Sequence, residues 1–377
     1  MDANILVLDS SGKRNDFIFR LLATLATDGF SVRLAAGANS LLIAKFKEAR
    51  WPWRRWRGLW PGRSALWVLA LPYFWLVNFF VLAWYKYARQ TTGIIALNWP
   101  EKVAASAPAK LLGLRLIWLE LPNTDYQALA KPWRWFFQKD SLKAGIICFS
   151  LTTKLALINL GLPEDNIKLI WPGVDLAEVQ QQADIFQGLA KQNYPQAAGN
   201  FFTVGTVVDL AEPQKIENLI RVLNNCLTVT PNLRLIVIGD GPARAQVDWL
   251  AKKLGLESRV WLVGGQADLK KWCANFNLFI VANARPDLDD FIVALSAMAN
   301  AVPVIAPQDM SLDDCFLGGQ AGILLSLDSQ EELGAQIIKL QQNVVWRKAL
   351  GVSARRVVKD FFSWQRAAQE FKNAIGI

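Results

Sequence analysis

One stretch in the second half of the chain, Leu278–Ala306, constrains the fold more than any other part of the sequence. Leu278–Ala282 is an apolar run of strand length, and Val302–Ala306 is a second one. Between them an acidic loop leads into a segment with helical spacing, Phe291–Asn300. A strand, a helix and a second buried strand predict one unit of a parallel sheet. The first amide groups of such a helix are a ready site for an anion such as phosphate.

The same alternation of apolar strands and helices recurs on both sides of a polar segment, Gln180–Asn200. In the first half we expect strands at Asn4–Leu8, Phe30–Ala35, Gly93–Asn98, Leu114–Leu119 and Ala144–Phe149. In the second half we expect them at Phe202–Val207, Leu233–Ile238, Val260–Val263, Leu278–Ala282 and Val302–Ile305. This spacing predicts an α/β chain with two Rossmann-like, doubly wound domains.

The length of the chain, 377 residues, also exceeds what one hydrophobic core usually supports. We therefore expect a first domain at residues 1–178 and a second domain at 201–360. Residues 179–200 are expected to link them, and residues 361–377 to form a terminal helix.

Composition excludes several kinds of site. The chain has no histidine, which excludes histidine triads, histidine metal sites and histidine general bases. Its four cysteines form no Cys-x-x-Cys pair, so buried free thiols in a reducing compartment are expected rather than disulfides or a metal site. The net charge of +9 favours a polyanionic partner, either nucleic acid or anionic lipid. The chain begins directly on a strand, so we expect no signal peptide.

An uncharged segment of 21 residues, Ala65–Tyr85, has the length of a transmembrane helix. Pro72 divides it, however, and we interpret Ala65–Leu71 as a strand and Tyr73–Arg89 as a helix that crosses to the next strand. We favour this interpretation over a membrane span. A helix so apolar must then be covered, either by protein or by the membrane interface.

An ordered set of motifs runs through the chain. The second half contains Val204-Gly205-Thr206, then LRLIVIGDGPAR at Leu233–Arg244 and AMANAVPVIAP at Ala297–Pro307; the first half ends on PGVD at Pro172–Asp175. Together they resemble the retaining, family-4 GT-B glycosyltransferases (glycosyl transferases group 1) over essentially the whole chain. The resemblance implies two Rossmann-like domains facing a cleft, with the acceptor on the first and the nucleotide-sugar on the second. It also implies a C-terminal helix that returns to the first domain.

The resemblance further implies which residues hold the donor. The family neutralises the diphosphate with a basic pair; Lys215 is the candidate for one member, and Thr206 stands in place of the arginine. Glycine-containing turns follow the strands, although a purely structural corner explains the second-domain turn equally well. The candidate donor-binding residues are Gly12, Thr206, Lys215, Gly239, Gly241, Gly265, Phe291 and Ser296.

The catalytic positions are also implied by the resemblance. The family has a Glu-x7-Glu pair in the donor loop, and alignment places its second glutamate on Ser296 and its first on or near Leu288. Neighbouring aspartates substitute for the first glutamate, or else form a helix N-cap and a solvated turn. Glu120 stands where the family often has histidine. It is expected either to contact a sugar hydroxyl, to accept the proton of the acceptor, or to act as a structural cap. The candidate catalytic residues are Glu120, Asp287, Asp289 and Asp290.

A cationic segment in the first half, Lys45–Arg63, holds seven Lys or Arg residues and four Trp residues, and Lys131–Lys143 is similar. Tryptophan prefers the membrane interface, and clustered cations attract anionic headgroups. Single-stranded nucleic acid is the alternative ligand, and packing between protomers explains part of the Trp set. We prefer the membrane because the apolar Tyr73–Arg89 helix is nearby. The candidate membrane residues are Arg50, Trp51, Trp53, Arg54, Arg55, Trp56, Arg57 and Trp60.

Two functions follow. The first is a glycosyltransferase that transfers a sugar, with retention, from a nucleotide-diphospho-sugar to a lipid-linked or envelope glycan acceptor. It would act in polysaccharide biosynthesis at the inner, cytoplasmic face of the membrane, as a peripheral protein on an anionic surface, without a metal, a cofactor or nucleic acid. The second is a weakly active or inactive partner or scaffold in a glycan-assembly complex, because Ser296 and Thr206 replace charged residues.

Overall fold

The chain forms two compact units. The computed structural model describes residues 4–10, 15–56, 65–122, 124, 126, 131–142, 144–181, 201–208, 210–211, 213–266, 269–282, 287–308, 316 and 319–376. The first domain is Met1–Trp171 together with Ala367–Ile377, and the second domain is Pro172–Arg366. Most of the predicted linker, from residue 182 to residue 200, lies outside the described residues.

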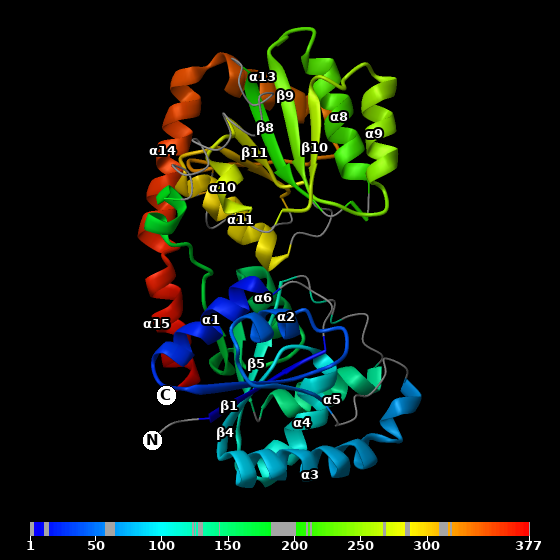
Figure 1. Cartoon of the computed structure of the whole chain (residues 1–377), viewed down its shortest axis with the longest axis vertical. Helices are drawn as coiled ribbons and strands as arrows, with labels where there is room; N and C mark the ends of the chain where they lie inside the picture. Colours follow the sequence, from blue (N-terminus) through cyan, green and yellow to red (C-terminus); the bar gives the residue numbers. More distant parts are fainter. Residues whose placement is uncertain are drawn as a thin grey trace. The chain divides into compact units, whose positions relative to one another are not determined.

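The first domain is built on a parallel sheet in which seven strands are described, in the order β3-β2-β1-β4-β5-β6-β7 (Figure 1). The strands are β1 (Asn4–Asp9), β2 (Ser31–Ala36), β3 (Trp53–Arg55), β4 (Thr91–Ala96), β5 (Arg115–Glu120), β6 (Gly145–Cys148) and β7 (Ile167–Leu169). The central strands are near-continuous apolar runs because helices cover both faces of a parallel sheet. Their side chains, among them Leu6, Ile94 and Trp118, are almost completely buried.

Helices lie on both faces of this sheet. Figure 1 shows α1 and α2 on one face and α3, α4 and α5 on the other. The helices are α1 (Asp16–Thr27), α2 (Leu42–Glu48), α3 (Leu71–Arg89), α4 (Trp99–Leu111), α5 (Lys131–Ser141) and α6 (Leu151–Asn159), with 3-10 turns η1 (Ala65–Val68) and η2 (Glu164–Asn166).

Two details of the first domain differ from the sequence-based expectation. The predicted strand Ala65–Leu71 is wrong, because its first residues form the 3-10 turn η1 and Leu71 already begins α3. Pro72 lies in the first turn of α3, where its missing N–H has no intrahelical partner to lose. In addition, Trp53–Arg55 forms edge strand β3, which the charged sequence did not predict.

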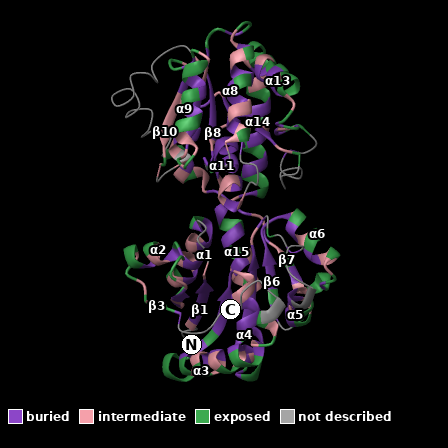
Figure 2. Cartoon of the chain, turned by 90° about the vertical axis from the view of Figure 1, so that its right-hand side faces the viewer, coloured by how far each residue is buried: buried purple, intermediate pink, exposed green. Residues whose placement is uncertain are grey.

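Helix α3 buries one face and exposes an unusually apolar one. Phe74, Leu82 and Tyr85 face the domain core. The opposite side carries five large side chains that are between 41% and 74% exposed: Tyr73, Leu76, Phe80, Trp84 and Tyr87. Figure 2 shows exposed segments along α3. No helix in the described part of the chain is both long enough and apolar enough to cross a membrane.

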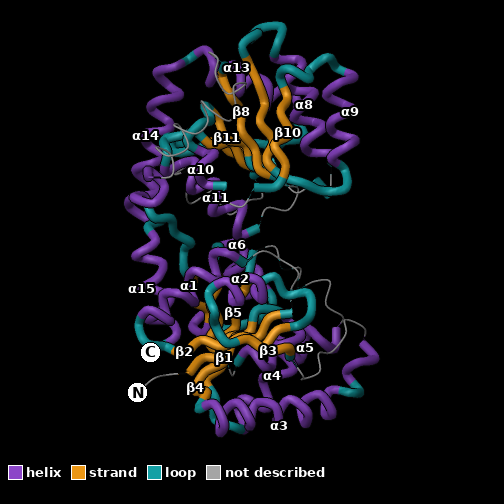
Figure 3. The backbone as a smooth tube through the Cα atoms, in the orientation of Figure 1, coloured by secondary structure: helices purple, strands orange, loops and turns teal. Residues whose placement is uncertain are grey.

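The second domain repeats the architecture. Six strands are described there, in the order β10-β9-β8-β11-β12-β13, and Figure 3 shows them as one twisted sheet. They are β8 (Phe202–Val207), β9 (Leu233–Ile238), β10 (Val260–Gly264), β11 (Leu278–Ile280), β12 (Val304–Ala306) and β13 (Ile323–Leu324). The helices are α8 (Gln214–Cys226), α9 (Arg244–Lys253), α10 (Lys270–Cys273), α11 (Leu288–Ala299), α13 (Gln330–Gln342) and α14 (Val344–Phe361). The predicted pair of doubly wound domains is thus confirmed.

Helix α8 illustrates how sequence periodicity positions an element. Its buried residues Ile216, Leu219, Ile220 and Leu223 recur at helical spacing and form one apolar stripe against the core. The stripe fixes the rotation of α8 about its axis. Lys215, one residue before Ile216, is therefore held at the first turn of the helix, beside the end of β8.

The last helix, α15 (Trp364–Ile375), returns to the first domain, as the sequence predicted. Lys372 forms an ion pair with Asp28, and the Arg115 Nη1 donates a hydrogen bond of 3.0 Å to the Gly376 carbonyl. The three described cysteines, Cys148, Cys226 and Cys273, are buried free thiols; Cys315 lies outside the described residues.

Candidate functional site

Each sheet has a point at which the strand order reverses, between β1 and β4 in the first domain and between β8 and β11 in the second. Ligands of open α/β sheets bind at this point, outside the carboxyl ends of the strands. In the second domain, Thr206 lies at the end of β8 and Lys215 lies in the first turn of the helix that follows. Gly239, Gly241 and Gly265 follow the carboxyl ends of the adjacent strands β9 and β10. We refer to this edge as the donor edge.

Besides Arg244, which begins α9 directly after the glycine turn, the donor edge carries the cation Lys215. Its Nζ lies 2.6 Å from Oδ1 of Asp328, and the lysine side chain is 27% exposed. The segment that carries Asp328 is fastened to α8, because Asn218 bonds the Leu327 carbonyl and Gln330 bonds Asn218. An exposed ion pair of this kind is weak, so a phosphate group can take the place of the aspartate.

The glycines of the donor edge mainly permit close approach of backbone segments. Gly239 has φ +150°, and a Cβ built there would lie 1.8 Å from the Val208 carbonyl oxygen. A Cβ at Gly241 would lie 2.6 Å from the backbone of Leu210. Gly265 is exposed and has no comparably close neighbour. Backbone packing alone therefore requires glycine at residues 239 and 241, which supports the structural alternative for that turn.

The acidic loop ends in a complete helix cap. The Asp287 carboxylate accepts hydrogen bonds from the amides of Asp289 and Asp290, at 2.9 and 3.0 Å. In return the Asp290 carboxylate accepts the Asp287 amide at 2.8 Å. Two amides that an incoming phosphate would use are thus already bonded to a carboxylate. The N-cap that the sequence analysis left open as an alternative is present, while residues 283–286 lie outside the described part of the loop.

Two other predicted donor residues lie inside α11. Ser296 is completely buried, and its Oγ donates a 2.7 Å hydrogen bond to the Ile292 carbonyl one turn earlier. The Phe291 ring is buried against Phe362, and its amide already donates to the Asp287 carbonyl at 3.1 Å. Both residues hold α11 in place in this structure.

Thr206 also has a buried side chain. Its Oγ1 makes no hydrogen bond to any residue that the structure describes. A buried hydroxyl without a partner carries a desolvation cost of about 1–3 kcal/mol. The threonine thus lies at the end of β8, as predicted, but is covered rather than presented to solvent.

In the first domain, Glu120 forms a buried ion pair. Its Oε1 lies 2.9 Å from the Nζ of Lys102, and the two side chains are 1% and 2% exposed. Its Oε2 accepts a 2.6 Å hydrogen bond from the hydroxyl of Tyr126. Burial lowers the pKa of Lys102, which the charge of Glu120 opposes. Burial, with the same carboxylate next to it, raises the pKa of Tyr126 well above its usual value.

The sequence analysis missed a second carboxylate group at the first reversal point. Asp9 ends β1 and accepts a 3.0 Å hydrogen bond from Asn98, which follows β4. Asn98 also reaches Glu101, in the first turn of α4. Burial raises the pKa of Glu101 to about 7, with a further increase from the charge of Asp9, against a hydrogen bond from Ser10. A carboxyl group that titrates near neutrality is suited to proton transfer, so Asp9 and Glu101 join the candidate site.

Their position was visible in the sequence, because Asp9 directly follows the predicted strand Asn4–Leu8 and Asn98 ends the predicted strand Gly93–Asn98. Gly12, the predicted first-domain candidate, belongs to the turn after β1 and lies outside the described residues. In the described part of the chain, no group of three Cys, Asp or Glu residues is arranged to hold a metal ion.

The predicted membrane residues divide into two groups. Trp51 packs against Phe19 and Phe46, and Trp56 is buried in the core of the first domain. The exposed members are Arg50, Arg54 and Arg55, with Trp53 half-buried beside Lys47; Arg57 and Trp60 lie outside the described residues. The cations of this segment are thus presented to solvent, while two of its tryptophans stabilise the fold.

A known protein family matches the region of the chain that contains the donor edge. The family model described as glycosyl transferases group 1 matches residues 200–343, which span β8 to α13. The second domain is a glycosyl transferases group 1 domain. The predicted family is therefore confirmed for this domain, and Lys215, Gly239 and the α11 cap all lie within the matched region.

The chain is similar to proteins named for polysaccharide biosynthesis. The Vi polysaccharide biosynthesis protein VipC/TviE of Salmonella typhi is 30% identical over 124 residues, which are 32% of this chain and 21% of that protein. The capsular polysaccharide biosynthesis glycosyltransferase CapM of Staphylococcus aureus is 23% identical over 237 residues, 62% of this chain and 59% of CapM. The chain thus matches less than two thirds of the length of either relative.

A solved structure resembles the whole chain. The HepE protein of Anabaena, crystallised in complex with UDP, matches over 99% of both chains with a TM-score of 0.80 and 18% identity. At this identity the likeness shows the fold. The GT-B arrangement of two Rossmann-like domains, expected from the motifs, is confirmed.

Proposed function

We propose that the chain is a GT-B glycosyltransferase of polysaccharide biosynthesis. It transfers a sugar, with retention of configuration, from a nucleotide-diphospho-sugar to a lipid-linked or envelope glycan acceptor. The observation that carries the proposal is the glycosyl transferases group 1 domain at residues 200–343. The relatives named for Vi and capsular polysaccharide synthesis support the pathway class, and the UDP complex of HepE supports UDP as the first nucleotide to test.

The chemistry of the proposal rests on Lys215. In such a transfer the bond from the sugar to the diphosphate breaks, and negative charge develops on the departing phosphate. A fixed cation at that point stabilises the transition state. The Asp287 carboxylate already occupies two amides at the start of α11, and we assign the stabilising charge to Lys215.

We expect Lys215→Ala to weaken binding of UDP and UDP-glucose by about 10- to 100-fold, because a hydrogen bond to a charged group contributes about 1.5–3 kcal/mol. Asp328→Asn removes the competing carboxylate and should strengthen binding by up to about fivefold. Isothermal titration calorimetry on the full chain measures both effects.

Lys252→Ala is the matched control. Lys252 also pairs with a carboxylate at 2.6 Å, that of Asp248, but lies in the last turn of α9, away from the donor edge. Its replacement should leave nucleotide affinity within about twofold of the wild type. Equal losses in Lys215→Ala and Lys252→Ala would show that general charge, and not a donor site, governs binding.

A non-catalytic partner in a glycan-assembly complex is the second candidate. The observations that favour it are the capped α11, the buried Ser296 and the Asp328 carboxylate on Lys215. Titration with UDP-, GDP- and ADP-sugars separates the two candidates. Absence of binding to every nucleotide-sugar would refute the enzyme, whereas release of free nucleotide from a bound sugar donor would refute the inert scaffold.

We also propose that the first domain lies on an anionic membrane at the cytoplasmic face. The exposed apolar side of α3 and the cations of β3 support this proposal. Apolar side chains gain free energy on leaving water, and nearby cations attract anionic headgroups.

Replacing Leu76 and Phe80 together with serine should therefore weaken binding to phosphatidylglycerol vesicles by about tenfold or more. Vesicle flotation measures the bound fraction. The control, Val345→Ser with Val352→Ser, removes two exposed apolar side chains from α14 in the second domain and should leave flotation unchanged. Failure of the wild-type chain to float with anionic vesicles would refute the membrane proposal.

A further inference from the structure

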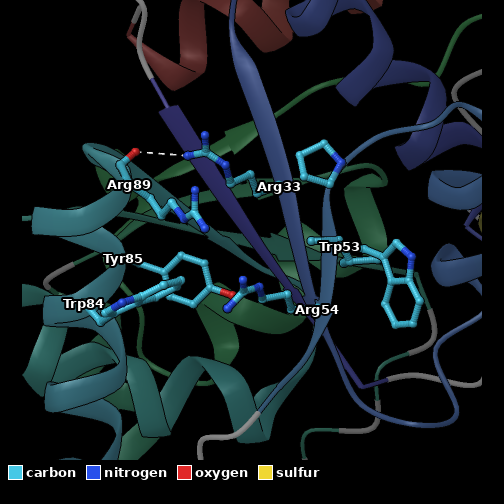
Figure 4. A pocket seen from close by; sticks show the side chains of 8 residues that line it. Arg33, Trp53, Arg54, Trp84, Tyr85 and Arg89 are labelled. Atoms are coloured by element: carbon cyan, nitrogen blue, oxygen red, sulfur yellow. Dashed lines mark hydrogen bonds between the residues drawn. The ribbon is translucent and has the colours of Figure 1, made fainter.

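A cavity of about 260 Å³ lies in the first domain between β2, β3 and the end of α3. Its lining includes three arginines, Arg33, Arg54 and Arg89, with Trp84 and Tyr85 between them. Figure 4 shows Arg33 and Arg54 reaching in from the strands, and Arg89, Tyr85 and Trp84 coming from α3. Three cations converge here from elements far apart in the sequence. We call this cavity the arginine pocket.

The three guanidinium groups have no acidic partner among the residues that the structure describes. Arg33 donates to the Arg89 carbonyl at 3.0 Å, drawn as the dashed line in Figure 4. The guanidinium carbons of Arg54 and Arg89 lie 5.1 and 5.3 Å from the centre of the Trp84 ring. Their contacts orient the guanidinium groups and leave their charges uncompensated.

The positive charges of the three arginines also act on the Tyr85 hydroxyl. Burial raises the pKa of Tyr85, and the charges of Arg54, Arg33 and Arg89 act in the opposite direction. All three arginines are thus near enough to favour a negative charge at this hydroxyl. Like charges held together in one pocket repel each other, and a bound anion removes that repulsion.

A second, mainly apolar pocket adjoins the arginine pocket. It has a volume of about 730 Å³ and is lined by Arg55, Trp56, Phe80 and Val81, and it shares Arg54, Trp84 and Tyr85 with the arginine pocket. The combined surface therefore joins a cluster of arginines to a group of apolar side chains. A ligand that fits both has an anionic head and an apolar body.

Two of the three arginines lie away from the carboxyl edge of the sheet. Arg33 lies in the first half of β2, and Arg89 ends α3 directly before β4 begins. Both positions belong to the amino ends of the parallel strands, whereas Arg54 is in register with Ala35 near the end of β2 and reaches back to Trp84 of α3. The carboxyl ends, with Asp9 and Glu120, lie at the opposite edge of the same sheet.

We propose that the arginine pocket binds the phosphate group of an anionic membrane phospholipid, whose apolar part lies along the adjoining pocket and the exposed face of α3. Guanidinium groups suit this ligand because they bond phosphate oxygens in pairs. The inference rests on the membrane association proposed above and makes it specific: a discrete phosphate site, and not diffuse charge alone, holds the domain on the lipid.

The test uses Arg54→Gln/Arg89→Gln in the full chain, with dihexanoylphosphatidylglycerol monomers as the probe in calorimetry. The double variant should lose at least about tenfold in affinity, since each bond from a charged donor to phosphate is strong. The control Lys110→Gln/Lys168→Gln removes the same charge from exposed positions of the same domain. Lys168 lies on β7, at the other edge of the sheet, so the control should stay within about twofold of the wild type.

Two further measurements complete the test. Arg54→Lys/Arg89→Lys keeps the charge but not the paired geometry, and should bind the short-chain lipid several-fold more weakly than the wild type. Inorganic phosphate should bind at least about tenfold more weakly than the lipid, because it does not use the apolar pocket. Equal affinity for inorganic phosphate would overturn the lipid assignment. If Arg54→Gln/Arg89→Gln binds the short-chain lipid with the affinity of the wild type, the arginine pocket is not the binding site. The membrane proposal would still stand in that case, provided that the wild-type chain floats with anionic vesicles.

Discussion

Replacing Lys102 with methionine is expected to reduce the stability of the first domain by about 3–5 kcal/mol. The substitution shortens the unbranched side chain by one atom and removes its charge. Glu120 would then remain as an uncompensated carboxylate that is 1% exposed, and the 2.7 Å hydrogen bond from Lys102 to the Leu119 carbonyl would be lost. Native-state hydrogen exchange of the β4 and β5 amides measures the loss within the first domain alone.

Lys110→Met is the matched control, since Lys110 is an exposed lysine on the same helix, α4. It should change stability by no more than about 0.5 kcal/mol. Lys102→Met combined with Glu120→Gln should regain most of the loss, because the isolated charge is gone while the Tyr126 hydroxyl keeps an acceptor. A deficit below about 1 kcal/mol in Lys102→Met would contradict the buried pair.

The same double variant tests the predicted catalytic role of Glu120. A folded Lys102→Met/Glu120→Gln chain that transfers sugar at the wild-type rate would assign Glu120 to structure. A folded chain that binds donor without transfer would assign it to catalysis. The single variant Glu120→Gln separates these roles less well, because it leaves Lys102 buried without a counter-charge.

Strand positions could be predicted because buried parallel strands are continuous apolar runs. Phe202–Val207 and Leu233–Ile238 are reproduced to the residue. Strand β3 was missed for the converse reason: Trp53-Arg54-Arg55 lies at the edge of the sheet and needs no apolar run. The strand predicted at Ala65–Leu71 was wrong because a short apolar segment fits a helical turn and a strand equally well.

The location of the candidate site could be predicted from the sequence, but its hydrogen bonds could not. Alignment and periodicity put Lys215 and Asp287 at the carboxyl ends of strands, where the structure has them. Whether a carboxylate faces a ligand or caps its own helix depends on backbone angles that no spacing reveals. Asp287 accepts two amides of α11, and Ser296 bonds the turn before it. Burial is similarly a tertiary property, so the sequence alone does not distinguish Glu101 from an ordinary first-turn acid.

The second large effect concerns Glu101 and pH. Burial raises its pKa from 4.5 to about 7. Below pH 4.5 the folded and unfolded chains both hold the proton, so folding carries no penalty. Between pH 4.5 and 7 the unfolded chain releases the proton while the folded chain retains it, and the stability of the folded state falls as pH rises. At about 1.4 kcal/mol per unit, the total loss is about 3 kcal/mol, complete above pH 7.

Glu101→Gln removes this titration while it keeps a side-chain amide in contact with Asn98 and Ser10. The variant should therefore gain about 3 kcal/mol relative to the wild type between pH 4.5 and pH 8, again measured by hydrogen exchange in the first domain. Glu48→Gln is the control, an exposed acid at the end of α2 in the same domain. If the difference in stability between the wild type and Glu101→Gln stays constant across this pH range, Glu101 ionises as it does in the unfolded chain. That result would remove Glu101 from the candidate site, because a carboxyl group that is already ionised at pH 5 has no proton to transfer near neutrality.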